Sequence, residues 1–457
     1  MMKTRKLSVG AKLKFGVGDF GCSVITGLIQ FYMLFYYTDV VGIKPGLAGT
    51  AMLVGKLTWD MVNDVLFGYL EDKTRSRWGR RRPYLIFGAV PLMLSFWLLL
   101  SLPRGMSDVV AFFAVIGSFI LFDTFHTLVA TAYAAMSAEL TDDYDERTSM
   151  TTYRMVFNIV GYIFGAGVTT MVADIIRNAM GLDIRGAWSI MGLIYGGLGA
   201  ITLLIPGLFL KEMPVVEAEP TKLPPLKAIF STLKNKPFVS YLIISMIMST
   251  AFTMVTTMMP YYMIYQLRMA DAQTLIMVLM MGTLALCLVP CSMVSGKIGK
   301  AKTYALGITI ASLGLVVAFF LTGKGNTIFY LAAIVGLGFS SQWVCPHSMM
   351  PDVIEQDELV TGERREGIYF GMNATAGKIT GALGSAICGW GLELGGYVEG
   401  GAVQTASALT AIRGMFALLP ALLLLVCVPL LIRYPITRES HAQVLKQLEE
   451  RRKEQSK

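Results

Sequence analysis

Long apolar segments separated by short polar ones run through almost the whole chain. A helix that crosses a bilayer core needs about 20 mostly apolar residues, and twelve such segments can be read from the sequence. They cover roughly residues 15–37, 46–70, 83–102, 109–136, 152–175, 187–210, 238–264, 272–295, 302–322, 327–350, 368–392 and 408–434. The pattern predicts an all-α membrane protein with twelve transmembrane helices.

The longest polar break between these segments divides the chain into two halves of six segments each. It lies between Lys211 and Lys236 and contains four prolines, which suit an extended linker. After the linker and the second half, a charged tail follows that is expected to be at most a solvated helix. The predicted domains are an N-terminal six-helix bundle over 1–210, a cytoplasmic linker over 211–237, a C-terminal six-helix bundle over 238–434 and a cytoplasmic tail over 435–457.

A weak internal repeat supports this division. The basic stretch Gly68–Pro83 follows the second apolar segment, and a shorter counterpart, Ser295–Lys302, follows the eighth. Two repeated halves with a substrate site between them near the membrane midplane are the plan of a major-facilitator-type carrier. The predicted fold class is therefore the major facilitator fold, with its twelve transmembrane helices in two six-helix bundles.

The composition agrees with a membrane location. Hydrophobic residues make up 54% of the 457 residues and charged residues 15%, whereas soluble proteins carry about 25% charged residues. The net charge of +8 comes from basic residues in short loops on one side, which indicates membrane topology and not a nucleic-acid partner. We expect a monomer in the plasma (bacterial inner) membrane, surrounded by lipid, with both termini in the cytoplasm.

The sequence lacks the usual motifs of enzymes and cofactor-binding proteins. It contains no Gly-rich phosphate loop, no metal-ligand cluster and no nucleophile–histidine–acid set. Its six cysteines fit neither a zinc site nor a disulfide framework. We therefore expect no enzyme activity and no cofactor; the candidate ligands are a small-molecule substrate and a coupling ion, Na⁺ or H⁺.

The most informative polar residues lie inside the second apolar segment. Lys56, Asp60 and Asp64 are spaced i, i+4, i+8 and would follow one face of an α-helix. One charge at the bilayer centre costs roughly 2.5–3.5 kcal/mol, so three facing lipid would cost about 8–10 kcal/mol. We expect them to face the protein interior or a wet cavity, where two carboxylates exceed what one lysine neutralises and can bind a cation or a proton. The alternative is a structural lysine–aspartate cluster that ties helices together.

Two residues of the fourth segment could also carry a proton. Asp123 and His126 are spaced i, i+3, and a histidine titrates near neutral pH. The pair is a candidate for tuning the coupling if the ion is H⁺. The alternative is a pair that stabilises the outer end of the helix.

Six short stretches and one lysine follow one another in an order typical of one transporter family. They are Phe35–Gly42, Trp59–Asp64, Arg77–Pro83, Glu139–Arg147, Pro351–Glu355 and Thr361–Gly371, followed by Lys378. This ordered set resembles the glycoside–pentoside–hexuronide:cation symporter family, the melibiose-permease branch of the major facilitator superfamily. The resemblance spans residues 18 to about 385.

The resemblance implies a cation site on the second helix. Asp60 and Asp64 fall where the family's cation-binding carboxylates lie, and Thr127 falls where a hydroxyl completes that site. Lys378 matches a basic residue of helix eleven near the cation. Lys56 stands one residue out of register with the family's basic residue, which indicates a small insertion that re-aims it.

The resemblance also implies a substrate site, with departures from the family. Two acidic sugar-binding positions of melibiose permease align with Ser23 and Ala130, which argues against melibiose-like galactosides and weakens the case for sodium. Asp19 fits a common family pattern near Ser23. The residues expected to face substrate are Asp19, Ser23, Arg154, Gln342, Trp343 and Lys378. Because Arg154 and Lys378 would suit a carboxylate or sulfonate, they slightly favour an anionic glycoside.

The main hypothesis is a cation-coupled symporter, driven by Na⁺ or H⁺, that imports a sugar, glycoside or hexuronide by alternating access. A second hypothesis keeps the fold but changes the cargo to a lysolipid or another amphiphile. A third is a sensor that binds substrate without transporting it.

Overall fold

The computed structural model describes residues 7–141, 143–211, 232–321, 325–363 and 365–455, and within them every regular element is a helix. The first half contains α1 (Val9–Phe35), η1 (Tyr36–Val41), α2 (Pro45–Gly55), η2 (Lys56–Asp60), α3 (Met61–Lys73), α4 (Arg82–Leu99), α5 (Asp108–Leu140), α6 (Tyr144–Gly167), α7 (Thr169–Met180) and α8 (Ile184–Phe209). The second half contains α10 (Lys236–Tyr261), η3 (Tyr262–Gln266), η4 (Ala270–Ala272), α11 (Gln273–Leu286), α12 (Leu288–Ile298), α13 (Lys300–Phe320), α14 (Thr327–Thr361), α15 (Glu366–Leu394), α16 (Ala406–Arg413), η5 (Gly414–Leu418), α17 (Leu419–Ile432) and α18 (Arg438–Gln455).

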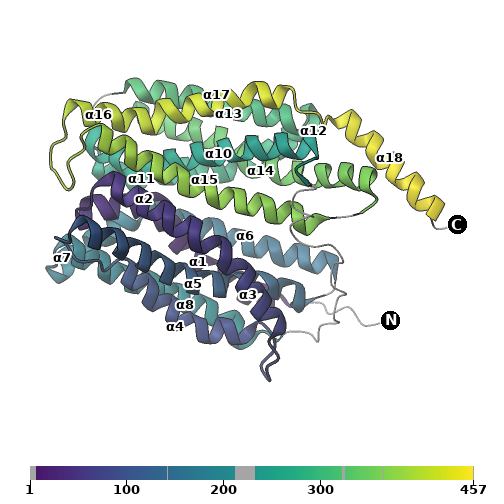
Figure 1. Ribbon diagram of the computed structural model, residues 1–457, viewed down its shortest axis with the longest axis horizontal. Coiled ribbons are helices and arrows are strands. Elements are labelled where there is room, and N and C mark those ends of the chain that lie inside the picture. The colour runs from purple at the N-terminus through teal and green to yellow at the C-terminus, as the bar shows by residue number, and fades with distance from the viewer. Residues whose placement is uncertain (1–6, 142, 212–231, 322–324, 364, 456–457) are drawn as a thin grey trace.

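The helices form two bundles that lie side by side (Figure 1). The N-terminal bundle holds α1 to α8, and the C-terminal bundle holds α10 to α17. Both chain termini lie at the same end of the molecule, which we call the terminus end. Most of the predicted linker, residues 212–231, lies outside the described residues.

Twelve helical paths follow the twelve apolar segments. Eight described helices are long and apolar enough to cross a membrane, or ten if each of two bent pairs is one span. The bent pairs are α6–α7, at 56°, and α11–α12, at 41°. The remaining two predicted segments are α2–η2–α3 and α15. They contain glycines and the charged residues Lys56, Asp60, Asp64 and Lys378. These two paths pack against each other, so their polar faces meet protein, where partners can satisfy them.

The end opposite the terminus end is closed by hydrogen bonds between the bundles. The hydroxyls of Thr38 and Tyr261 lie 2.7 Å apart. Asp39 accepts a hydrogen bond from the hydroxyl of Tyr397 at 2.7 Å and another from the hydroxyl of Tyr265. We call this end the closed end.

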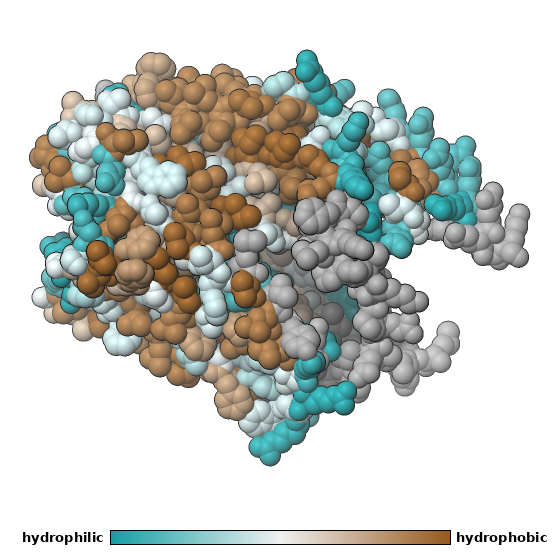
Figure 2. All heavy atoms as spheres, in the orientation of Figure 1, coloured by the Kyte–Doolittle hydropathy of each residue, from teal (hydrophilic) through white to brown (hydrophobic). Residues whose placement is uncertain are grey.

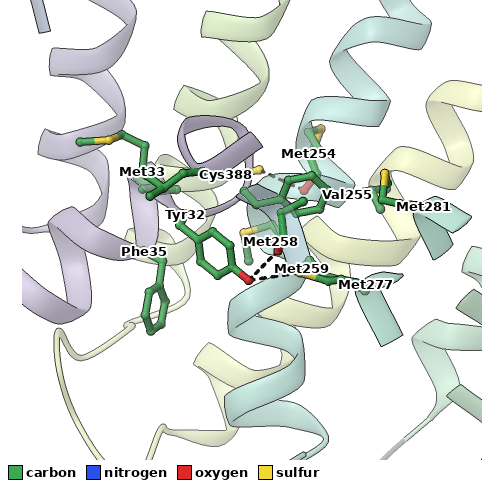
Figure 3. Packing of buried hydrophobic residues seen from close by; sticks show 14 of the residues in the cluster. Tyr32, Met33, Phe35, Met254, Val255, Met258, Met259, Met277, Met281 and Cys388 are labelled. Atoms are coloured by element: carbon green, nitrogen blue, oxygen red, sulfur yellow. Dashed lines mark hydrogen bonds between the residues drawn. The ribbon is translucent and has the colours of Figure 1, made fainter. Parts of the chain in front are cut away.

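Apolar packing reinforces the closed end. Figure 3 shows Tyr32 of α1 directed toward methionines of α10 and α11. The Tyr32 hydroxyl donates to the carbonyl of Ala166 at 2.8 Å and lies 3.2 Å from the sulfur of Met277. Methionine is flexible and fills irregular gaps, so these side chains fill the space between the two bundles at this end.

The glycines of α15 show where the bundles separate. A Cβ at Gly371 or Gly377 would meet no atom within 4 Å, whereas one at Gly384 would lie 3.0 Å from a side chain of α10. A Cβ at Gly389 would collide with the carbonyl oxygen of Pro45 in the other bundle. The face of α15 is therefore open toward the terminus end and packed toward the closed end.

The surface agrees with a membrane protein. Figure 2 shows hydrophobic side chains over the middle of both bundles and hydrophilic ones toward both ends, most of them at the terminus end. On the face shown, the molecule is hollowed between the bundles at that end. The hollow and the exposed glycines of α15 indicate a chamber that opens on one side.

The tail is more than the solvated helix that the sequence predicted. Nε2 of His441 lies 2.6 Å from Oε2 of Glu355, and Arg451 donates to the carbonyl of Leu359 at 3.2 Å. Leu448 is buried. The helix α18 therefore docks on the last turns of α14, because three of its side chains find partners there.

Candidate functional site

Lys378 of α15 connects the two bundles. It lies where the open part of this helix, toward the terminus end, meets the packed part. Nζ of Lys378 lies 2.5 Å from a carboxylate oxygen of Asp60 and 2.5 Å from one of Asp64. Lys378 comes from the C-terminal bundle, and the two aspartates come from the N-terminal bundle, 318 and 314 residues away. The sequence predicted this grouping through the family resemblance, and the three side chains do come together.

The cluster is accessible and not electrically neutral. The Asp64 side chain is 42% exposed, Lys378 is 30% exposed and Asp60 is 11% exposed. One ammonium and two carboxylates leave a charge of −1 on the cluster. Carboxylate oxygens are the ligands that hard cations prefer, so this arrangement can accept one further monovalent cation or a proton.

Lys56 does not join the two aspartates as the helical spacing suggested. The segment Lys56–Asp60 forms a π-helical turn, which closes with i→i+5 hydrogen bonds and so accommodates one extra residue. Its ammonium lies 5.7 Å from the centre of the Phe119 ring on α5. The one-residue insertion seen in the sequence therefore turns Lys56 toward α5, and Lys378 is the cation that bonds Asp60 and Asp64.

Among the described residues no hydrogen bond or ion pair joins Asp123 to His126, and their role in tuning the coupling stays a prediction. Asp123 lies near the middle of α5, is buried and accepts a 2.5 Å hydrogen bond from the amide of Asn63. The His126 ring lies against Phe122, with ring centres 5.3 Å apart. Asp123 therefore holds α5 to α3, and it does not lie at the outer end of the helix.

Thr127, one turn beyond Asp123, is buried on α5. Its backbone carbonyl accepts the hydroxyl of Thr131 at 2.7 Å. In the described part of the chain, no hydrogen bond joins Thr127 to Asp60 or Asp64, so its place as a cation ligand stays a prediction.

A second polar cluster lies between α1 and α6 in the N-terminal bundle. Nε of Arg154 donates to Asp19 at 2.9 Å, and the amide of Asn158 donates to the same carboxylate oxygen at 3.2 Å and to the hydroxyl of Ser23 at 2.8 Å. The Arg154 guanidinium also lies 5.1 Å from the ring centre of Tyr133. Three residues predicted to face substrate are thus one hydrogen-bonded group, joined by an asparagine.

Glycines bring these side chains within reach of one another. Asp19, Ser23 and Gly27 follow one face of α1, and Arg154, Asn158 and Gly161 follow one face of α6. A Cβ at Gly27 would lie 2.7 Å from a carbonyl oxygen of α6, and one at Gly161 would collide with the carbonyl of Phe20 on α1. Small residues permit this close approach of two membrane helices, so the glycines set the geometry of the cluster.

Trp343 and Gln342 lie on α14, in the opposite bundle. The ring of Trp343 stands edge-on to that of Tyr162 on α6, with centres 6.2 Å apart. Oε1 of Gln342 is buried and has no hydrogen-bond partner among the described residues. An unpaired buried carbonyl is costly, so Gln342 is suited to accept a hydrogen bond from a ligand or water.

Sequence reasoning missed three residues of these groups. Asn158 could have been found because it lies one helical turn after Arg154, and Asn63 because it lies between the two aspartates. Asp39 sits in the stretch Phe35–Gly42 that carried the resemblance, but nothing in its spacing indicates the three hydroxyls that surround it. These come from its neighbour Thr38 and from Tyr265 and Tyr397.

Comparison with known proteins agrees with this architecture. A family model described as MFS/sugar transport protein matches residues 14–438. The isoprimeverose transporter of Lactiplantibacillus pentosus is 26% identical, over 90% of this chain and 85% of its own. The glucuronide carrier protein homolog of Escherichia coli (strain K12) is 24% identical, over 99% of this chain and 98% of its own.

Solved structures show the same fold. The crystal structure of the nucleoside transporter NupG superposes with a TM-score of 0.65 at 14% sequence identity, covering 93% of this chain and 100% of its own. With the helical bundles, the apolar spans and the matched family model, the fold and the membrane location are confirmed. The chain belongs to the MFS/sugar transport protein family, in its glycoside–pentoside–hexuronide:cation symporter branch.

Proposed function

We propose that this protein is a symporter that carries a sugar or glycoside together with one monovalent cation, Na⁺ or H⁺, into the cell. The observation that carries the proposal is the bridge from Lys378 to Asp60 and Asp64. It joins the two bundles where the closed end meets the open chamber, and it holds one carboxylate charge more than the lysine neutralises.

The cation acts on this bridge. A cation bound between the carboxylates competes with the Lys378 ammonium for the same oxygens, so it changes how firmly the cluster holds the bundles together. A ligand shifts a conformational equilibrium only by its differential affinity for the two states. A site built from both bundles has such a difference, because the Lys378 ammonium moves away from the carboxylate oxygens of Asp60 and Asp64 when the bundles rock.

The substrate lies closer to the cluster of Asp19, Ser23, Arg154 and Asn158. This cluster offers carboxylate and hydroxyl acceptors beside amide and guanidinium donors, which is the mixture that sugar hydroxyls need. On the opposite bundle, Gln342 supplies an acceptor and Trp343 an aromatic face. A ligand held between both sets of residues would contact both bundles, as alternating access requires.

Orientation follows from the basic loops. With both termini in the cytoplasm, the terminus end faces inward, and the chamber is open to the cytoplasm. The hydrogen bonds of Asp39 then form the outer gate. The monomer embedded in lipid expected from the sequence remains part of this proposal.

A thermal-shift screen of the purified protein tests the proposal. Sugars, glycosides, uronides and lysolipids are added with and without Na⁺, at two values of pH. We expect stabilisation by a sugar or glycoside that grows when Na⁺ is added or the pH is changed, since cation and substrate stabilise one loaded state. Stabilisation by lysolipids alone would contradict the proposal, and binding without flux in proteoliposomes would indicate a sensor.

A further inference from the structure

The cations of the chamber are already bonded to carboxylates of the protein itself. Nε of Arg154 donates to Asp19, and in the described part of the chain the hydrogen bonds of the Arg154 guanidinium go to Asp19 alone. Lys378 donates to Asp60 and Asp64. The expectation that Arg154 and Lys378 wait for a substrate carboxylate therefore does not fit the geometry.

The charges of the two clusters can be counted directly. The pair of Arg154 and Asp19 sums to zero, and Lys378 with two aspartates sums to −1. The Lys56 ammonium lies 5.7 Å from the centre of the Phe119 ring, and among the described residues no hydrogen bond joins it to either cluster. Neither cluster thus has a positive charge to spare for an anionic substrate, and a carboxylate approaching Arg154 would also approach Asp19.

The geometry points to Asp19 as a selectivity residue that makes the carrier prefer uncharged glycosides over those bearing a carboxylate. This inference rests on the proposed function and names the substrate class of the same site. Asp19 acts by pairing with the Arg154 guanidinium and neutralising its charge. The Asp19 side chain is 8% exposed, and its carboxylate is held by Asn158 as well as by the guanidinium. The Arg154 side chain is 26% exposed, so its remaining N–H groups can still donate to neutral hydroxyls.

Burial makes the pair selective. A charged pair that is partly withdrawn from water interacts strongly, and a second anion brought beside it is left without a counter-charge. A neutral hydroxyl requires no counter-charge. Asp19 should therefore discriminate between substrates by their charge and leave the recognition of their hydroxyls unchanged.

The test uses two probes that differ in one group. The compounds are 4-nitrophenyl β-glucoside and 4-nitrophenyl β-glucuronide, with the corresponding galactoside pair as a second set, and the measurement is their affinity ratio for the purified full-length protein. Wild type should prefer the uncharged member. Asp19→Asn keeps the shape and removes the charge, so it should shift the ratio toward the uronide by at least about tenfold, the size of one hydrogen bond to a charged group.

Two further variants keep the test decisive. Asp174→Asn removes the same charge from an exposed position of α7 and should leave the ratio unchanged. Arg154→Gln leaves the Asp19 charge alone in the site and should shift the ratio the other way, which still tests the inference if Asp19→Asn does not fold.

Wild type that prefers the uronide, or ratios that stay unchanged in Asp19→Asn and Arg154→Gln, would overturn the inference while leaving a glycoside symporter intact. If wild type binds no glycoside of either kind in this assay or in the thermal-shift screen, the proposed function fails and the inference fails with it.

Discussion

Both ends of α15 contain several glycines, but these glycines have different surroundings. Toward the terminus end, Gly371 and Gly377 face open space, and toward the closed end Gly384 and Gly389 are pressed against the neighbouring helices. Lys378 stands at the boundary and bonds the carboxylates of the other bundle. Glycine thus serves two purposes along α15. Toward the terminus end it leaves open space beside the helix, and toward the closed end it permits tight packing of the two bundles.

This difference shows how an ion can control the whole molecule. Hydrogen bonds and packing hold the closed end, whereas charge holds the boundary. Under the proposed function, a monovalent cation would act on the contact at the boundary, because it would add to the charge of the cluster there.

The largest effect is expected at the boundary. One positive charge moved inward is worth about 2.3 kcal/mol per 100 mV, which corresponds to roughly 50-fold accumulation of substrate. Asp60→Asn removes the excess carboxylate charge and should reduce accumulation in proteoliposomes to simple equilibration. Asp174→Asn should accumulate substrate as wild type does, and full accumulation by Asp60→Asn would remove that residue from the coupling site.

The next effect concerns the bridging lysine. Lys378→Met removes the ammonium of the C-terminal bundle that bonds Asp60 and Asp64 of the N-terminal bundle, so the two bundles lose this attraction and separate more easily. Gradient-driven uptake should fall at least about tenfold, the equivalent of roughly 1.4 kcal/mol. The double variant Lys378→Met with Asp60→Asn should lose less than the sum of the two single effects, because the groups interact; strict additivity would show that the bridge has no energetic role.

The glycines of α15 offer a matched pair of variants. Gly389→Ala places a methyl group against the Pro45 carbonyl, and overpacking of this kind costs about 1–3 kcal/mol. It should lower the melting temperature, whereas Gly371→Ala should leave it unchanged or raise it slightly, because alanine favours helix. Equal melting temperatures for the two variants would contradict the difference between the ends.

The smallest effect is expected at the outer gate. Tyr397→Phe removes one donor to Asp39, worth about 0.5–1.5 kcal/mol. It should increase outward opening by roughly two- to tenfold. Gln30 of α1 reports this opening, because its amide donates to Thr256 of α10 at 2.9 Å across the contact between the bundles. The measurement is the rate at which a membrane-impermeant maleimide labels Gln30→Cys in a cysteine-free background, with Gln30→Cys alone as the reference. An unchanged labelling rate would show that the Asp39 hydrogen bonds do not hold this end closed.

The sequence predicted the arrangement of helices well because hydrophobic length is a local property. All twelve apolar segments are helical paths, and even the two with charged interiors were found. Local pattern cannot predict the bends at α6–α7 and α11–α12, or the π-helical turn at Lys56, since these depend on what each helix packs against. For the same reason the i, i+4 spacing predicted that Lys56 would lie with Asp60 and Asp64, whereas its ammonium lies against the Phe119 ring.

The candidate site was only partly predictable. The grouping of Asp60, Asp64 and Lys378 followed from the family resemblance, but no spacing rule joins residues more than 300 positions apart. The bond between Asp19 and Arg154 was missed because it depends on the close approach of α1 and α6. That one contact changes the expected substrate from an anionic glycoside to an uncharged one.

The equilibrium accumulation of a bound glycoside in wild-type proteoliposomes, at a series of imposed membrane potentials and without any substrate gradient, tests the central claim most directly. If one monovalent cation travels with each uncharged substrate, accumulation should rise roughly 50-fold for every 100 mV of inside-negative potential. Accumulation that does not depend on the potential would contradict the account.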